Sequence, residues 1–308
     1  MNRAGSSDDV ASSPTEKLRP MRTLLFAPAN HARRVQRVDD FGADAVVLDL
    51  EDAVPDDEKV SARAYVTPAL SRYQHGLRCV RVNALSTGLT YGDLDAAVGP
   101  HLDAVVLPKT ESPEHLRLVD SELARLEKLR GIEPGSILLL PLVETAVAIM
   151  RAYEIALEAP TRTPRLIFGL GDFSVDIGVS LTQDGDELLY AKSKVVVASR
   201  AARLAAPLDG PFTEIHDVEG LRANTLRSRA LGFQGRVIVY PGQVETANTV
   251  YSQAPEAEII RYRKIVQAFE QAESDGSASI QVDGTFVDYP IYRRAVDVLA
   301  EHDSRSGA

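Results

Sequence analysis

The chain of 308 residues has little of several features that mark particular classes of protein. Its single cysteine, Cys79, excludes a disulfide within the chain and any zinc site built from several cysteines. No apolar run reaches the roughly 18 residues of a membrane-spanning helix, and no secretory signal pattern opens the chain. Lysine and arginine number 34 against 44 acidic residues, a formal net charge of −10. We therefore expect a cytoplasmic protein without nucleic-acid or membrane partners.

Short apolar runs alternate with amphipathic helical patterns along most of the chain, which predicts parallel strands covered on both faces. The expected strands are 23–28, 45–50, 79–83, 104–108, 137–143, 166–169, a weaker 210–215, and 236–240. The expected helices include 58–73, 113–130, 146–158, 187–204 and 218–231. This alternation favours a (β/α)8 TIM barrel over a doubly wound sheet, because no dinucleotide-binding glycine fingerprint follows the first strand.

The pattern continues past the eighth strand as a helix–hairpin–helix appendage. A charged helix over 255–276 precedes two short strands around Asp283-Gly284, which is typical of a hairpin turn, and a helix over 291–300 follows. We expect this appendage to lack a core of its own and to act as a lid on a barrel. The predicted division is a disordered tail over 1–19, the barrel over 20–252, the lid over 253–302 and a tail over 303–308.

Two acidic residues, Glu144 and Asp172, each close an apolar run that we expect to form a strand. The carboxyl ends of parallel strands meet at one rim of a barrel, and neighbouring strands lie about 4.8 Å apart. Two carboxylates there can share one hard cation, which indicates a site for Mg²⁺ or Mn²⁺. The pattern alone also fits helix caps or polar rim groups, since Asp172 stands where an N-cap is expected.

Further charged residues follow the second, third and fourth expected strands. Asp49, Glu51 and Asp52 would repel one another unless they are paired, and strand alternation puts Asp49 and Glu51 on one face. Arg81 can hold a carboxylate or thioester oxygen, or it can form an ion pair at the rim. We expect Lys109 to pair with these acids rather than to contact a substrate.

Eight short stretches form one ordered pattern over residues 21–300. They are Leu24-Leu-Phe-Ala-Pro-Ala-Asn30, Gly42-Ala-Asp-Ala-Val-Val-Leu-Asp-Leu-Glu-Asp-Ala-Val-Pro55, Arg81-Val-Asn83, Val106-Leu-Pro-Lys109, Leu142-Val-Glu-Thr-Ala146, Ile167-Phe-Gly-Leu-Gly-Asp172, Asp217-Val-Glu-Gly-Leu221 and Val287-Asp-Tyr-Pro290. Together they resemble the citrate lyase β-subunit-like proteins of the HpcH/HpaI aldolase superfamily, which include malyl-CoA, β-methylmalyl-CoA and citramalyl-CoA lyases.

The resemblance implies a Mg²⁺-dependent carbon–carbon lyase. Its substrate would be a 3-hydroxyacyl-CoA thioester, cleaved through a thioester enolate to an acyl-CoA and a 2-oxo acid such as glyoxylate or pyruvate. Glu144 and Asp172 resemble the metal ligands of the family, and Arg81 resembles its substrate arginine, which would stabilise the enolate.

By the same resemblance Glu51 and Asp52 are catalytic residues that accept hydrogen bonds from metal-bound water. Pairing with Lys59, Arg63 or Lys109 accounts for these two acids as well.

The segment Gly169-Leu170-Gly171 is a candidate substrate-binding loop, because glycines let backbone N–H groups approach a small carboxylate closely. Flexibility alone explains these glycines equally well.

For coenzyme A, the candidate contacts lie just past the first strand, where a basic helix start can take phosphate oxygens. They are Phe26, Asn30, Arg33, Arg34 and Arg37. A solvated basic helix face explains the arginines equally well.

Asp288 resembles an acid/base residue that the appendage of a neighbouring subunit delivers to the site. The resemblance therefore implies a homo-oligomer, most simply a trimer, with Asp288 shared between subunits. A helix cap before Pro290 is the plainer interpretation of Asp288.

Two positions depart from the family pattern. Gly171 stands where many relatives have an acidic or amide residue, and Tyr240-Pro-Gly-Gln243 replaces His-Pro-x-Gln. Two other functions stay open. One is a metal-dependent aldolase on free 2-oxo-4-hydroxy acids, although such relatives generally lack the appendage. The other is a non-catalytic subunit, or the β subunit of a citrate lyase complex.

Overall fold

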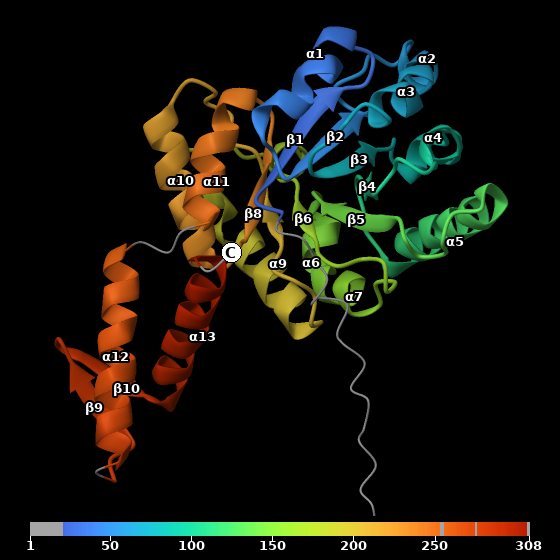
Figure 1. The fold of residues 1–308 in the computed structure, drawn as a ribbon. Coiled ribbons are helices and arrows are strands. Elements are labelled where there is room, and N and C mark those ends of the chain that lie inside the picture. Colours follow the sequence, from blue (N-terminus) through green and yellow to red (C-terminus); the bar gives the residue numbers. More distant parts are fainter. Residues whose placement is uncertain (1–20, 253–255, 275, 307–308) are drawn as a thin grey trace, which may run out of the picture. The chain divides into compact units, whose positions relative to one another are not determined.

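The computed structural model describes residues 21–252, 256–274 and 276–306 (Figure 1). The predicted tail over residues 1–19 lies outside the described residues. The chain divides into two compact units, residues 1–248 and residues 249–308.

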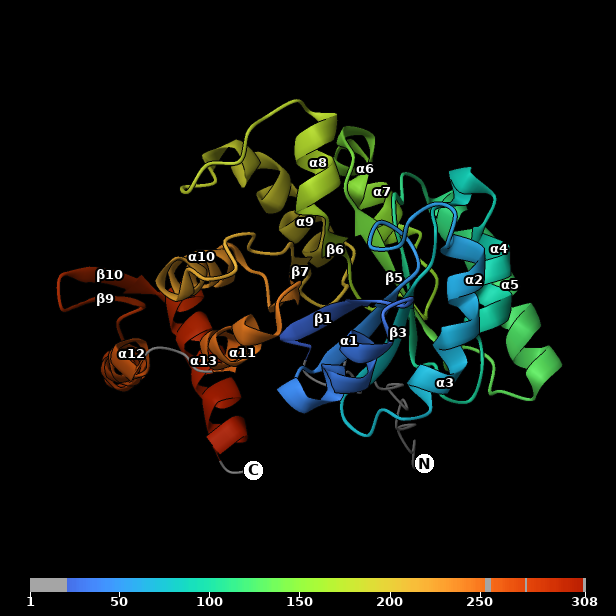
Figure 2. The ribbon, with the colours of Figure 1, turned by 90° about the horizontal axis from the view of Figure 1, so that it is seen from above.

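The first unit contains a closed barrel of eight parallel strands that pair in chain order, with β8 returning to β1 (Figures 1 and 2). The strands are β1 (Thr23–Pro28), β2 (Ala45–Asp49), β3 (Leu77–Arg81), β4 (Ala104–Leu107), β5 (Leu138–Val143), β6 (Ile167–Phe168), β7 (Leu208–Asp209) and β8 (Gly235–Ile238). Helices surround the barrel, so the predicted TIM-barrel class is confirmed.

The surrounding helices follow the predicted segments, with breaks. They are α1 (Ala32–Arg37), α2 (Lys59–Ala62), α3 (Val66–Leu70), α4 (Thr90–Ala97), α5 (Pro113–Arg130), α6 (Ala146–Met150), α7 (Ala152–Leu157), α8 (Leu170–Asp176), α9 (Leu189–Ala201), α10 (Val218–Leu231) and α11 (Val244–Ser252). Helix α5 has the predicted bounds because Ser112 caps its start, Pro113 is its first residue and Gly131 ends it with a φ of 67°. No helix among the described residues is long and apolar enough to span a membrane.

Two predicted elements were placed wrongly, both near proline. The helix expected over 58–73 is broken into α2, a 3-10 turn and α3, and Pro68 lies within α3. Proline lacks the N–H that would continue the ladder of helical hydrogen bonds. The seventh strand was expected over 210–215 but ends at Asp209, before Pro211 can interrupt its pairing.

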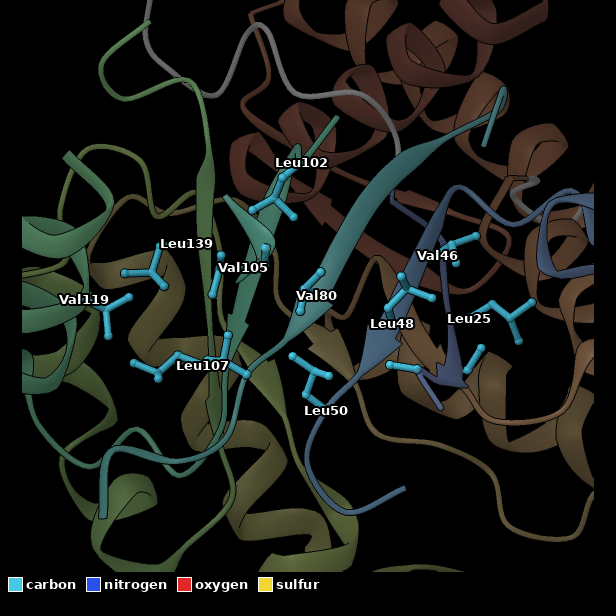
Figure 3. Close-up of a cluster of buried hydrophobic side chains, with 14 of the residues drawn as sticks. Leu25, Val46, Leu48, Leu50, Val80, Leu102, Val105, Leu107, Val119 and Leu139 are labelled. Carbon is cyan, nitrogen blue, oxygen red and sulfur yellow. The ribbon is translucent and has the colours of Figure 1, made fainter. Parts of the chain in front are cut away.

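Alternate strand residues pack into two separate cores, which fixes what points into the barrel mouth. Leu25, Val46 and Leu48 belong to the core between sheet and helices, shown in Figure 3. Ala45 and Val47 belong instead to the core inside the barrel. Because side chains alternate along a strand, the last residue of β2, Asp49, faces inward with them.

The second unit consists of α12 (Glu256–Ser274), β9 (Ser279–Val282), β10 (Thr285–Asp288) and α13 (Tyr289–Ser306). The hairpin turn is where the sequence predicted it, with positive φ at Asp283 and Gly284. Helix α13 continues through residues that were predicted to be a tail.

The expectation that this appendage lacks a core of its own is wrong. Ile265, Phe269, Val287 and Ala295 form a buried cluster within it, surrounded by partly buried apolar side chains. The amphipathic faces of α12 and α13 bury this cluster together with the hairpin.

Candidate active site

The strands bring seven charged side chains to the carboxyl rim of the barrel, and we call these residues the rim cluster. It consists of the acids Asp49, Glu51, Asp52, Glu144 and Asp172 and the cations Arg81 and Lys109. Asp49 and Arg81 end β2 and β3, Glu144 follows β5 directly, and Asp172 lies in the first turn of α8. Five strand ends therefore supply one site.

Arg81 is the centre of the first half of the cluster. Its Nε and Nη2 donate to the two oxygens of Asp49 at 2.7 and 2.6 Å, and its Nη1 lies 2.9 Å from Glu51 Oε2. Asp52 is 3.4 Å away, and the guanidinium lies over the Phe26 ring. The rim ion pair that the sequence left open is thus formed, and the bidentate contact with Asp49 fixes the orientation of the guanidinium.

Lys109 connects the two halves of the cluster. Its ammonium lies 2.8 Å from Glu51 Oε1 and 2.9 Å from Asp172 Oδ2, and its backbone N–H donates to Glu144 Oε1 at 2.8 Å. The expected pairing of Lys109 with the acids is therefore present. Of the other suggested partners, Lys59 donates to the backbone carbonyl of Glu51 and lies 3.9 Å from Asp56, whereas Arg63 pairs with Asp93.

Glu144 is buried, and Gly169 on the neighbouring strand end makes room for it. A Cβ at position 169 would lie 2.3 Å from both Cβ and Oε2 of Glu144. The backbone N–H of Gly169 donates to the carbonyl of Val143, so it is not turned toward a ligand. Glycine is needed at position 169 because a larger side chain would overlap Glu144. The sequence had suggested a different reason, namely a backbone N–H that approaches a substrate carboxylate. Around Gly171, by contrast, a Cβ would meet nothing within 4 Å.

Neither proposed metal ligand caps a helix. Thr145 caps α6 through its side chain, and Gly169 occupies the N-cap position of α8, so that Asp172 is the third residue of that helix. The interpretation of Glu144 and Asp172 as caps therefore does not apply.

The rim cluster contains more negative than positive charge, because five carboxylates face two cations. Burial raises the pKa of Glu144 to about 8, and the nearby carboxylates of Glu51 and Asp172 contribute to that rise. Burial also raises the pKa of Glu51, against the opposing effect of Arg81. Glu51 Oε2 and Asp172 Oδ2 are buried without a hydrogen bond of good geometry.

These features fit a hard divalent cation. Such a cation would balance the excess of carboxylate oxygens, including Glu51 Oε2 and Asp172 Oδ2, which are buried and held only by ion pairs at 2.9 Å. In the described part of the chain, no three acidic, histidine or cysteine side chains are grouped as a complete metal site. Glu144 and Asp172 would thus supply two ligands, and water and substrate would supply the rest, as is usual for Mg²⁺.

A cavity of about 840 Å³ opens beside the rim cluster. Its lining includes Arg81, Asp49 and Asp52 of the rim cluster, and Phe26, whose ring lies against Arg81. It also includes Tyr240 and three arginines of α1, namely Arg33, Arg34 and Arg37, which we call the basic wall of the cavity.

Two other predicted site residues have contacts of a different kind. Asn30 is absent from the described cavity lining, and its side-chain amide donates to Glu58 at 2.6 Å. Asp288, in the second unit, accepts a hydrogen bond from the backbone N–H of Ile291 at 3.3 Å and so caps α13. This is the plainer role that the sequence allowed for Asp288.

Sequence reasoning missed how Asp49 and Lys109 organise the cluster. Asp49 accepts both Arg81 donors as well as the backbone N–H groups of Glu51 and Ala53. Inward alternation along β2 was the available signal for Asp49. Asp209, at the end of β7, pairs with Lys192 at 2.9 Å and was not predicted at all.

The chain is similar to several known proteins along most of its length. The pattern of the HpcH/HpaI aldolase/citrate lyase family matches residues 22–241. The citrate lyase subunit β of Leuconostoc mesenteroides subsp. cremoris is 36% identical over 92% of this chain and 93% of its own. A (3S)-malyl-CoA thioesterase of Cereibacter sphaeroides is 34% identical over 87% and 90%. The mitochondrial citramalyl-CoA lyase of Mus musculus is 28% identical over 94% and 88%.

Among solved structures, the CitE protein of Mycobacterium tuberculosis in complex with magnesium, acetoacetate and coenzyme A superimposes with a TM-score of 0.74. It is 27% identical, over 94% of this chain and 99% of its own. The chain belongs to the HpcH/HpaI aldolase/citrate lyase family, and the predicted identification as an enzyme of this lyase family is confirmed.

Proposed function

On the premise of this family membership, we propose that the protein is a Mg²⁺-dependent carbon–carbon lyase acting on a 3-hydroxyacyl-CoA thioester of the malyl-CoA, β-methylmalyl-CoA or citramalyl-CoA type. The products are an acyl-CoA and a 2-oxo acid, glyoxylate or pyruvate. One observation carries the proposal: a single cavity is lined by Arg81, Asp49 and Asp52 of the rim cluster and by the three arginines of α1.

Glu144 and Asp172 are the residues that would hold Mg²⁺, or Mn²⁺ in its place. The excess negative charge and the buried carboxylate oxygens support this assignment, and so does the magnesium bound by the relative from M. tuberculosis. Held by these two residues, a divalent cation would supply Lewis acidity toward the substrate hydroxyl. Glu51 and Asp52 lie beside these ligands and would accept hydrogen bonds from water at the cation.

Arg81 is the group that would stabilise the thioester enolate. Its Nε and Nη2 are fixed on Asp49, so the guanidinium is oriented before a substrate binds. Arg81 lines the cavity, where a thioester oxygen can approach it. The charge that develops on that oxygen during cleavage would then be next to a fixed cation.

The basic wall of the cavity suits the phosphates of coenzyme A. Arg33, Arg34 and Arg37 supply positive charge, and Phe26 supplies an apolar surface near the rim cluster. Coenzyme A in the M. tuberculosis complex and the name of the citramalyl-CoA relative support a thioester substrate. Asn30 would contribute only by exchanging its present contact with Glu58. The N–H groups of Leu170 and Gly171 are the candidates for holding a small substrate carboxylate.

Asp288 would deliver the proton to the enolate carbon from a neighbouring subunit, which makes the protein a homo-oligomer, most simply a trimer. The half-buried carboxylate lies at the junction of β10 and α13, where its Oδ1 accepts a hydrogen bond from the backbone N–H of Ile291. A carboxylate placed in this way can serve as an acid/base group for a second chain.

The test is turnover with Mg²⁺ and a panel of malyl-CoA, β-methylmalyl-CoA, citramalyl-CoA and free 2-oxo-4-hydroxy acids, followed by release of 2-oxo acid. Cleavage of a thioester, lost in Glu144→Ala and strongly reduced in Asp288→Asn, is the expected result. Cleavage of the free acids alone would replace the proposal with an aldolase. Thiol release without a 2-oxo acid would indicate a thioesterase, and no turnover at all would indicate a non-catalytic subunit.

A further inference from the structure

Lys109 holds three carboxylates of the rim cluster through two different parts of one residue. Its backbone N–H bonds to Glu144, while its ammonium contacts Glu51 and Asp172. Its φ of 48° lies in the left-handed region, which is uncommon for a residue other than glycine. This conformation directs the backbone donor and the side chain toward the same cluster.

The backbone part of this arrangement does not depend on the lysine side chain. The N–H of Thr110 donates to the carbonyl of Leu142, and its hydroxyl donates to the carbonyl of Leu107. These bonds tie the turn after β4 to the neighbouring strand ends. A substitution at position 109 can therefore remove the ammonium and leave the N–H contact with Glu144 in place.

The ammonium is placed where it opposes a second cation. It lies against Asp172, one of the two residues that would hold the metal, and its side chain is 36% exposed. A divalent cation bound by Glu144 and Asp172 would have a positive charge as a close neighbour, and like charges at such separations repel strongly in a partly buried site. In the metal-free protein the same ammonium offsets repulsion among the acids.

We propose that Lys109 is a built-in counter-ion with which Mg²⁺ must compete, so that the lysine side chain sets the metal affinity of the site. Lys109 is then a positioning residue whose backbone shapes the site and whose side chain stabilises it until metal binds. This inference rests on the proposed function, because it requires Glu144 and Asp172 to bind the cation.

The experiment is isothermal titration of Mg²⁺ into the metal-stripped full-length protein and into Lys109→Met and Lys109→Gly. We expect both variants to bind Mg²⁺ about tenfold more tightly, because each removes the neighbouring charge. Glycine also accepts the positive φ without strain, so it serves if the methionine variant folds poorly. In EDTA, Lys109→Met should have a lower melting temperature than the unsubstituted protein. Saturating Mg²⁺ should reduce this difference in melting temperature.

Lys192→Met is the matched control. Lys192 pairs with the buried Asp209 at 2.9 Å, and neither residue belongs to the rim cluster. Its loss should lower the melting temperature equally with and without Mg²⁺ and leave the affinity unchanged. Equal tightening in this control would overturn the proposal, and so would unchanged or weaker binding by both Lys109 variants. If the original protein fails to bind Mg²⁺, the metal site of the proposed function fails too.

Discussion

Two clusters of charged residues lie at opposite ends of the same strands and differ in how well their charges are matched. At the amino ends of β5 and β6, Glu127 accepts hydrogen bonds from both terminal nitrogens of Arg162 and from the backbone N–H groups of Gly135 and Ile137. Arg162 also bonds to Asp120. At the carboxyl ends, the rim cluster has five acids for two cations. Its Glu51 Oε2 and Asp172 Oδ2 are buried and held only by ion pairs.

The pKa directions express this difference. Burial alone would raise the pKa of Glu127, but the hydrogen bonds from Arg162, Gly135 and Ile137 hold it below its usual value. For Glu144 burial prevails and the pKa rises to about 8. A buried cluster whose charges are all paired and hydrogen-bonded stabilises the fold, whereas a cluster with surplus negative charge can bind a cation.

The largest effect on stability is expected at the amino end of the strands. Glu127→Ala should lower the free energy of unfolding by about 3–5 kcal/mol, because it leaves the buried Arg162 without its main partner. Denaturant unfolding measures the loss, and the Mg²⁺ affinity should not change. Glu114→Ala, which removes an exposed ion pair from the same helix, should cost less than about 1 kcal/mol. Equal losses in the two variants would contradict the claim that the buried, fully matched cluster around Glu127 stabilises the fold more than an exposed ion pair does.

Gly169→Ala should produce a smaller loss of stability and a clear loss of activity. The new methyl group overlaps Glu144, so overpacking should cost about 1–3 kcal/mol. The displaced carboxylate should lower kcat by about a hundredfold. Gly99→Ala is the control, since a Cβ there would meet no atom closer than 3.9 Å and the residue is outside the rim cluster, so neither quantity should change much. Normal kcat in Gly169→Ala would mean that Glu144 is not held at the reacting centre.

The smallest effect is a difference in pH dependence. The pKa of Glu144 is raised in the folded state, so its contribution to stability is present at low pH and is lost as pH rises toward about 8. Glu127 has a lowered pKa, so its contribution is lost as pH falls through the acid range. The melting temperature of the metal-free protein should thus fall as pH rises from about 4.5, the ordinary pKa of the group, to about 8. Glu144→Gln should remove this decline, and an unchanged decline would contradict the raised pKa.

Much of the fold follows from local patterns in the sequence. The bounds of α5 and α10 agree with prediction because capping residues and Gly131 or Gly232 mark their ends. The turn at Asp283 and Gly284 is equally local. The appendage core was missed because it joins residues from α12, β10 and α13, and no single segment shows enough apolar residues to reveal it.

For the site, the sequence by itself determined which residues reach the rim. Strand ends and alternation placed Glu144, Asp172 and Arg81 there, because parallel strands all end at one edge. Only the tertiary structure decided which charges meet. The distances between different strands pair Arg81 with Asp49 and let Lys109 bridge Glu51 and Asp172. They also decide that Gly169 leaves room for Glu144. Those distances are set when the barrel closes and packs, and no local pattern contains them.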